Sequence, residues 1–220
     1  MGKHTGYLIG MPGDNGAEQF TFYFTDIELL SLDPMMGLTS GPADPTESAV
    51  DVVALFSDVF SPVGDVTWST NWDEVTGPES VSLAGGNLSL KYSNVSYIGI
   101  EPNQTLNLSN MDTFHIDIWR SDATADLKIK LVDFGANGVW EQGGDNVEHE
   151  LVFHTENNNP IAANQWVSLD IALSQFNGLM TKEHIGQLIV SSHKNDGNGG
   201  LVGSGETLLI DNVYFYHSVI

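Results

Sequence analysis

Short runs in which apolar and polar residues alternate recur along most of the chain, and they predict β-strands rather than helices. From Val50 onward, residues that favour turns separate these runs, among them Gly77-Pro78, Gly85-Gly86 and Ser93-Asn94. The expected strands are Val52–Phe56, Val66–Trp72, Ser80–Leu83, Leu88–Tyr92, Tyr97–Ile100, Phe114–Trp119, Leu127–Phe134, Glu148–Phe153, Trp166–Ile171, Gln187–Ser191 and Thr207–Tyr216. Only Leu173–Phe176 and Lys182–Ile185 suggest short helical turns. This spacing predicts an all-β, two-sheet antiparallel β-sandwich.

The sandwich domain is expected to cover residues 49–220. Residues 34–48 are rich in Pro and Gly and predict a linker. Residues 20–32 are aromatic and partly alternating, so they predict one further strand. The pattern of Phe22–Leu29 resembles that of Leu208–Phe215, with an Asp inside each apolar run. Residues 1–33 are therefore interpreted either as the tail of a preceding sandwich module or as an extra strand of this domain.

The composition and charge of the chain exclude several classes of binding partner and site. The chain has 220 residues, only 7 Lys+Arg and a formal net charge of −22. So acidic a surface repels nucleic acid and anionic membranes, and it suits a neutral ligand, a cation or a saline medium. There is no cysteine, so no disulfide or zinc–thiolate site can form. No apolar run approaches the ~20 residues of a membrane span. The sequence starts without an apolar signal region, which suggests an excerpt from a longer protein.

Two consecutive strands suggest a polar sheet face. In Phe114–Trp119 the even-numbered residues are apolar and should face the core, which leaves His115, Asp117 and Trp119 on the other side. The next strand carries Lys130 and a second lysine on one side. These two neighbouring strands thus both present polar, long or aromatic side chains on one side. A solvated sheet face would look equally polar, but a large Trp there needs a reason, and stacking on a sugar ring supplies one.

Other aromatic residues occur at loop or edge positions. Trp140 lies in a glycine-rich loop with no obvious core, Trp72 ends an expected strand, and Tyr97 follows a turn. Core packing is the alternative for every aromatic residue, and it is favoured for Trp119 but only as probable as ligand contact for the other three. The candidate ligand-binding residues are Trp72, Tyr97, His115, Asp117, Trp119, Lys130 and Trp140.

Asp211 lies inside the apolar last strand, where an unpaired carboxylate is costly to bury. A structural Ca²⁺ held by Asp211, Asp58 and Ser57 would satisfy it. The alternative is a carboxylate that caps backbone N–H groups at a β-bulge. A second acidic cluster, Asp145–Glu150, is interpreted as a metal site, a sugar clamp or a solvated strand end.

Catalytic motifs are missing from the sequence. It contains no Gly-x-Ser-x-Gly elbow, no His-Glu-x-x-His and no phosphate-binding loop. The tight Glu-x-Asp-x-x-Glu strand of β-sandwich glucanases is also missing. The chain is therefore expected not to be an enzyme, and Asp145–Glu150 is the best place for an active site if it is one.

An ordered series of segments covers about three-quarters of the chain and carries a resemblance. The segments include Val53–Asp58, Trp68–Trp72, Lys91–Asn94, Tyr97–Glu101, Phe114–Trp119, Lys130–Ala136, Val147–Leu151, Trp166–Asp170 and Asp211–Phe215. Together they resemble a module appended to laminarinases and other polysaccharide-degrading enzymes of marine-type bacteria. The resemblance implies a jelly-roll sandwich similar to carbohydrate-binding modules for β-glucans and xylans, often with structural Ca²⁺ near the Asp that corresponds to Asp211.

The expected function is a non-catalytic module, secreted or at the cell surface, that tethers a covalently linked enzyme to its polysaccharide. A structural or adhesion spacer without a ligand is the first alternative. A β-sandwich polysaccharide lyase or hydrolase is the second.

Overall fold

The computed structural model describes residues 35, 37–141, 144–153 and 161–218. The chain divides into two compact units between Leu32 and Asp33, and every described residue belongs to the second unit. The interpretation of residues 1–33 as a module tail or an extra strand therefore falls outside the described residues. Within the described ranges, no helix is long and apolar enough to reach across a membrane.

The second unit is nearly all β. Its strands form an 11-stranded antiparallel sheet with the central order β7-β6-β9-β4-β11-β5-β8. The strands are β1 (Val52–Phe56), β2 (Val66–Thr67), β3 (Glu74–Ser82), β4 (Leu88–Pro102), β5 (Thr113–Arg120), β6 (Asp126–Asp133), β7 (Val147–Phe153), β8 (Trp166–Ala172), β9 (Ile185–Asn195), β10 (Leu201–Gly203) and β11 (Glu206–Tyr216), with 3-10 turns η1 (Ala49–Asp51) and η3 (Leu173–Gln175). The predicted all-β antiparallel class is confirmed.

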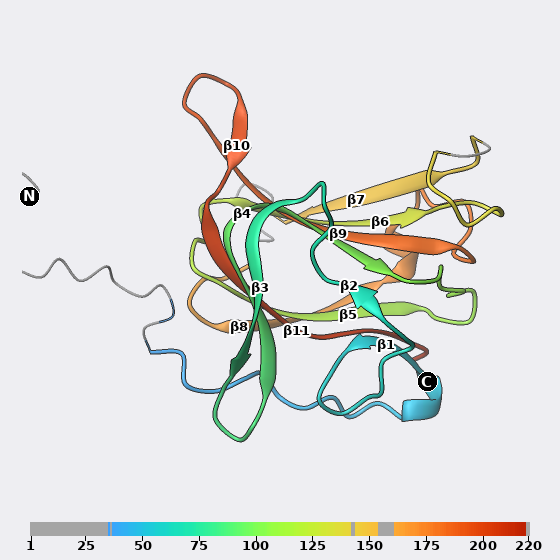
Figure 1. Ribbon diagram of the computed structural model, residues 1–220, viewed down its shortest axis with the longest axis horizontal. Helices are drawn as coiled ribbons and strands as arrows, with labels where there is room; N and C mark the ends of the chain where they lie inside the picture. Colours follow the sequence, from blue (N-terminus) through green and yellow to red (C-terminus); the bar gives the residue numbers. More distant parts are fainter. Residues whose placement is uncertain (1–34, 36, 142–143, 154–160, 219–220) are drawn as a thin grey trace, which may run out of the picture. The chain divides into compact units, whose positions relative to one another are not determined.

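The long strand β4 turns this sheet into a sandwich. The first half of β4 pairs with β11, whereas Tyr97–Ile100 pair with β9. Asn94, whose φ is +56°, lies between the two halves. One layer consequently contains β3, β11, β5 and β8, and the other contains β9, β6 and β7; Figure 1 shows β6, β7 and β9 apart from β5, β8 and β11.

Apolar side chains of both layers fill the space between them. Ile116 and Ile118 of β5 face Ile98 of β4 and Leu188 and Val190 of β9 in one buried cluster. The alternation predicted for Phe114–Trp119 is therefore correct, because the even-numbered residues are the buried apolar ones that join this cluster. Burial of these side chains supplies the main favourable free energy of folding.

Several expected boundaries differ from the structure. The strand expected at Val66–Trp72 is only Val66–Thr67, so Trp72 belongs to a loop. Two expected strands are one, because Asn94 bends β4 without ending its hydrogen bonding. The turn expected at Gly77-Pro78 is a register shift inside β3. No helical turn forms at Lys182–Ile185, since Ile185 already begins β9.

The segment expected to be a linker is bound to the sandwich from Thr39 onward. The carbonyl of Thr39 accepts a hydrogen bond from the backbone N–H of Ala84 at 3.1 Å. Trp166 Nε1 donates to the carbonyl of Ser40 at 2.9 Å. Further along, Tyr214 Oη donates to Glu47 at 3.0 Å. These contacts extend the domain to the N-terminal side of residue 49, so the described part of 34–48 is not a free spacer.

Candidate functional site

The layer of β4, β9, β6 and β7 has one side toward the core and one side away from it, which we call the outer face. Strand alternation and register determine which residues belong to it. The outer face carries Tyr97, Gly99 and Glu101 of β4, Gln187, Ile189 and Ser191 of β9, Lys128, Lys130 and Val132 of β6, and Glu148, Glu150 and Val152 of β7.

Trp72 lies on this face although its loop follows β2. Its ring stacks on Tyr97 with a centroid distance of 6.2 Å and an interplanar angle of 19°. The indole lies directly over Gly99, where a Cβ atom would come within 2.5 Å of the ring. Only a residue without a side chain allows so close an approach. Because Trp72 keeps 38% of its surface exposed, the pair is an aromatic platform that solvent reaches.

A second aromatic pair lies further along the same face. Phe134 continues the alternation of β6 and packs over Gly186, whose missing Cβ leaves room for the ring. Trp140 contacts Phe134 with a centroid distance of 5.9 Å and is 39% exposed. Ile189, which pairs with Gly99, is three residues from Gly186, so about 10 Å of β9 separates the two platforms.

Polar side chains occupy the space between and beside the platforms. Gln187 Nε2 donates to Glu101 Oε1 at 2.5 Å. Lys130 Nζ lies 2.8 Å from Glu148 Oε1 across the β6–β7 pair. Planar amide and carboxylate groups together with ammonium groups bind sugar hydroxyls, while aromatic rings stack on the apolar side of a pyranose. The outer face thus combines the two elements that sugar recognition requires.

Three of the predicted ligand-binding residues lie elsewhere. β5 pairs with β11 and β8, whereas β6 pairs with β7 and β9, so these consecutive strands lie in different layers. His115, Asp117 and Trp119 are 8%, 1% and 2% exposed. The prediction that they contact a ligand is wrong, because the chain connection between β5 and β6 crosses from one layer to the other and because these side chains are buried by the protein itself.

His115 instead belongs to a structural network. Its Nδ1 lies 2.7 Å from Asp170, its Nε2 lies 3.4 Å from Asp117, and its ring stacks on Tyr214 at 4.5 Å. Burial alone would lower the pKa of His115, but the hydrogen bonds and charges of the two aspartates outweigh it and raise the pKa. The imidazole therefore links β5 to Asp170 of β8 and to Tyr214 of β11.

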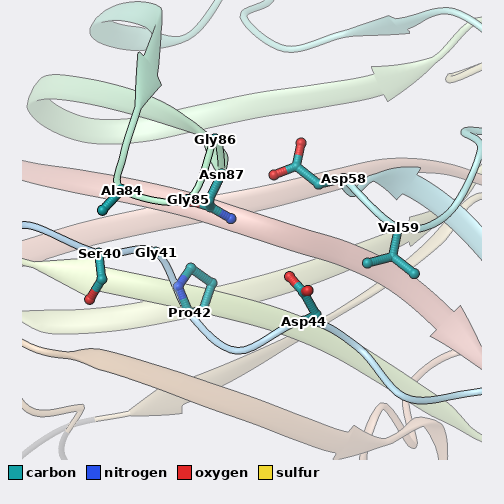
Figure 2. A pocket seen from close by; sticks show the side chains of 10 residues that line it. All are labelled: Ser40, Gly41, Pro42, Asp44, Asp58, Val59, Ala84, Gly85, Gly86 and Asn87. Carbon is teal, nitrogen blue, oxygen red and sulfur yellow. The ribbon is translucent and has the colours of Figure 1, made fainter.

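The residues of the expected calcium site meet at another place, beside a pocket between residues 40–44 and the loops of Asp58 and Asn87 (Figure 2). Asp211 is fully buried beneath Asn87, and its Oδ2 accepts hydrogen bonds from Asn87 Nδ2 at 2.9 Å and from Ser89 Oγ at 3.0 Å. Its Oδ1 accepts from the backbone N–H of Asn212 at 2.7 Å, at a register shift of β11. These are the contacts of the alternative interpretation, a carboxylate at a β-bulge.

The chemistry of the same place also suits a cation. Burial raises the pKa of Asp211 to about 6, and the negative charge of Asp58 adds to the rise. Figure 2 shows Asp44 directed into the pocket. The carboxylates of Asp44, Asp58 and Asp211 would offer a cation oxygen ligands, which Ca²⁺ prefers. Within the described ranges, no three Asp, Glu or His side chains are close enough to share an ion, so carbonyl groups or waters would have to complete the coordination. Ser57 fits less well, because its Oγ already bonds Asn212 and the N–H groups of Val59 and Phe60.

The coordinates resemble those of solved structures. A family 30 carbohydrate-binding module superposes with a TM-score of 0.52 at 15% identity, covering 77% of this chain and 89% of the other. The protein has the fold of a carbohydrate-binding module. A family 11 module from a cellulosomal cellulase of Clostridium thermocellum gives a TM-score of 0.48 at 16% identity, with 79% and 98% covered. The same organism's family 11 module in complex with a β-1,3-1,4-mixed-linked tetrasaccharide gives 0.47 at 16% identity, with 78% and 99% covered. No protein-family model matches the sequence, and neither does any curated protein.

At these identities the carbohydrate-binding-module fold does not by itself assign a ligand, since one fold serves many functions.

The acidic cluster Asp145–Glu150 has structural contacts of its own. Asp145 accepts a hydrogen bond from the backbone N–H of Ala136 at 2.9 Å, and Glu148 and Glu150 pair with lysines of β6. His149 contacts Phe176 with a centroid distance of 6.3 Å.

Sequence reasoning missed Gly99, Gln187, Phe134 and Glu101 as parts of the site. Each lies in a predicted strand or directly after one, on the side opposite the core. The alternation within each strand could have placed them on the outer side of its own strand. Which of these sides adjoin one another depends on strand pairing, which the alternation does not contain.

Proposed function

We propose that this protein is a non-catalytic carbohydrate-binding module that binds a neutral polysaccharide of the β-glucan or xylan class on its outer face. The observation that carries the proposal is the Trp72–Tyr97 stack, which is partly exposed and lies over Gly99 on the outer face. Exposed aromatic side chains of this size need a reason on a soluble surface, and stacking on sugar rings provides one.

Trp140 and Lys130 are proposed to complete the site. The spacing of about 10 Å between the two platforms favours a chain of several sugar units over a monosaccharide. Gln187 and Glu101, which lie between the platforms, are available to bind hydroxyl groups of the central units. In a secreted or cell-surface parent protein, such a module would hold a covalently linked catalytic domain on its substrate.

Affinity electrophoresis of the intact chain tests the proposal. Native gels containing mixed-linkage β-glucan, laminarin, xylan, starch or alginate are compared with gels that contain no polysaccharide. We expect retardation on at least one neutral glycan, and loss of retardation when Trp72 is replaced by alanine. A chain that is retarded on none of the neutral glycans would leave the alternative of a structural spacer. Reducing ends or unsaturated products released by the chain would favour the lyase or hydrolase alternative.

Structural calcium is a second part of the proposal. Ca²⁺ beside Asp58 and Asp211 would neutralise two carboxylates, one of them fully buried, at a place where β11 and the loop of Asn87 meet. Asp44 would join the segment of residues 40–44 to the same ion. A metal that binds only the folded state raises stability by mass action, so thermal unfolding in EDTA and in excess Ca²⁺ should differ.

A further inference from the structure

The outer face carries a ladder of opposite charges formed by two adjacent strands. Lys128 Nζ lies 3.1 Å from Glu150 Oε1, and Lys130 Nζ lies 2.8 Å from Glu148 Oε1 and 3.9 Å from Glu150 Oε2. These glutamates are more exposed than the lysines, whose side chains are only 20% and 22% exposed. The ammonium groups are thus oriented by β7 rather than left free to follow a ligand.

Other charges of the face are acidic. Lys128 and Lys130 are its only lysines or arginines within the described residues, because Lys91, Arg120, Lys182 and Lys194 lie on other surfaces or in the core. Glu101 belongs to the face, and Glu74 pairs with Tyr97 at its edge. Once both lysines are paired, the face has a net negative charge.

These charges bear on which class of glycan the outer face binds, and this step rests on the proposed function. We propose that Glu148 and Glu150 make the outer face selective for uncharged glycans by neutralising Lys128 and Lys130. A uronate or sulfated chain would approach ammonium groups that already have partners, and it would also meet the negative charges of Glu101 and Glu74. A neutral chain pays no such repulsion and can still accept hydrogen bonds from the remaining N–H groups of the lysines.

The charge ladder also explains why lysines occur here in a protein with so few. A free lysine pair on a sugar-binding face would be a site for carboxylates and sulfates. Because each lysine forms an ion pair with a glutamate of β7, the two lysines act as neutral hydrogen-bonding units. Glu148 and Glu150 are therefore specificity-determining residues that need not touch the sugar.

The test compares one polysaccharide in two charge states. Mixed-linkage β-glucan and its carboxymethylated form are used in affinity electrophoresis and calorimetry with wild type and with Glu148→Gln/Glu150→Gln. We expect the double variant to bind the carboxymethylated glucan about tenfold more tightly than wild type does at low salt. The gain should disappear at high salt, where the Debye length falls to about 3 Å. Affinity for the neutral glucan should change by less than about threefold.

A matched control removes the same charge away from the outer face. Glu79→Gln/Asp51→Asn frees Lys91, which lies 3.6 Å from Glu79 on the other half of β4, and should give no gain. Equal gains in both double variants would assign the effect to net charge and overturn the inference. The inference would also be overturned if wild type bound the neutral and the carboxymethylated glucan equally. It would be overturned as well if Glu148→Gln/Glu150→Gln kept its affinity for the neutral glucan and gained none for the carboxymethylated one. Wild type that is retarded on none of the neutral glycans would overturn the proposed function, and the inference with it; if the glycan that binds is xylan, the same comparison is made with xylan and its carboxymethylated form.

Discussion

Trp72 and Tyr97 stack with ring centroids 6.2 Å apart and planes inclined by 19°, although Trp72 lies in the loop after β2 and Tyr97 in the middle of β4. The contact depends on Gly99, which leaves space for the indole on the sheet. Neither ring belongs to the buried core. The pair is thus an aromatic surface that packing alone does not require, and this makes it the centre of the proposed glycan site.

Replacing Trp72 with alanine should weaken glycan binding by about 2 kcal/mol, roughly thirtyfold, as for a central aromatic anchor. Isothermal titration calorimetry with the glycan identified by electrophoresis measures the change. Trp166→Ala is the matched control, because Trp166 is half-buried in the other layer and bonds Ser40. It should lower stability and leave affinity unchanged. An unchanged affinity in Trp72→Ala would contradict the assignment of the site.

Gly99→Ala should displace the indole, because the new Cβ would come within 2.5 Å of the ring of Trp72. We expect weaker glycan binding and a loss of about 1–3 kcal/mol in the free energy of unfolding from overpacking. A double-mutant cycle checks the mechanism. In a Trp72→Ala background, Gly99→Ala should cost less of either quantity, since one of the two clashing side chains is gone while Thr70 Oγ1 still lies against the new Cβ. Additive effects would show that Gly99 acts without Trp72.

Arg120 and Glu206 form a buried ion pair that should dominate the response of the core to mutation. Arg120 Nη2 lies 2.6 Å from Glu206 Oε1, and the two side chains are 1% and 0% exposed. Arg120→Met should lower the free energy of unfolding by about 3–5 kcal/mol, because the buried Glu206 side chain loses its cation and keeps the hydrogen bonds from Ser192 and from the backbone N–H of Asp122. Urea denaturation measures the loss. Arg120→Met/Glu206→Leu should recover most of it, and a double variant as unstable as the single one would refute the explanation.

Asp211 should make stability depend on pH. Its pKa is raised to about 6 by burial, so the folded state binds the carboxyl proton more tightly than the unfolded chain does. This contribution is fully present below about pH 4 and is lost as pH rises through about 6, at a cost of about 3 kcal/mol. Urea denaturation between pH 4 and pH 8 in EDTA measures it.

Two comparisons separate Asp211 from the general repulsion of an acidic protein. Asp211→Asn should remove this part of the pH dependence in EDTA. Excess Ca²⁺ should remove it in wild type, because a bound cation stabilises the ionised carboxylate. If the free energy of unfolding of wild type depends on pH in the same way with Ca²⁺ and with EDTA, the proposed calcium site is wrong. The raised pKa of Asp211 is tested separately, by whether Asp211→Asn removes this pH dependence in EDTA.

The sequence by itself determined the class of the fold and most of the strands. Alternation of apolar and polar residues marks β5, β6 and β11 because a strand with one buried side must repeat with a period of two. It also determined the acidic surface and the presence of exposed aromatics such as Trp72 and Trp140 outside the expected core. These properties depend only on residues that are close together in the sequence.

Only the tertiary structure decided which faces meet. His115 and Lys130 belong to strands that are consecutive in the sequence. These strands, β5 and β6, nevertheless lie in different layers, because the chain crosses from one layer to the other between them. Trp72 reaches Tyr97 only because β2 pairs with the end of β4 and leads the chain back over Gly99. Pairing between distant strands depends on the packing of the whole core, and no local pattern specifies it.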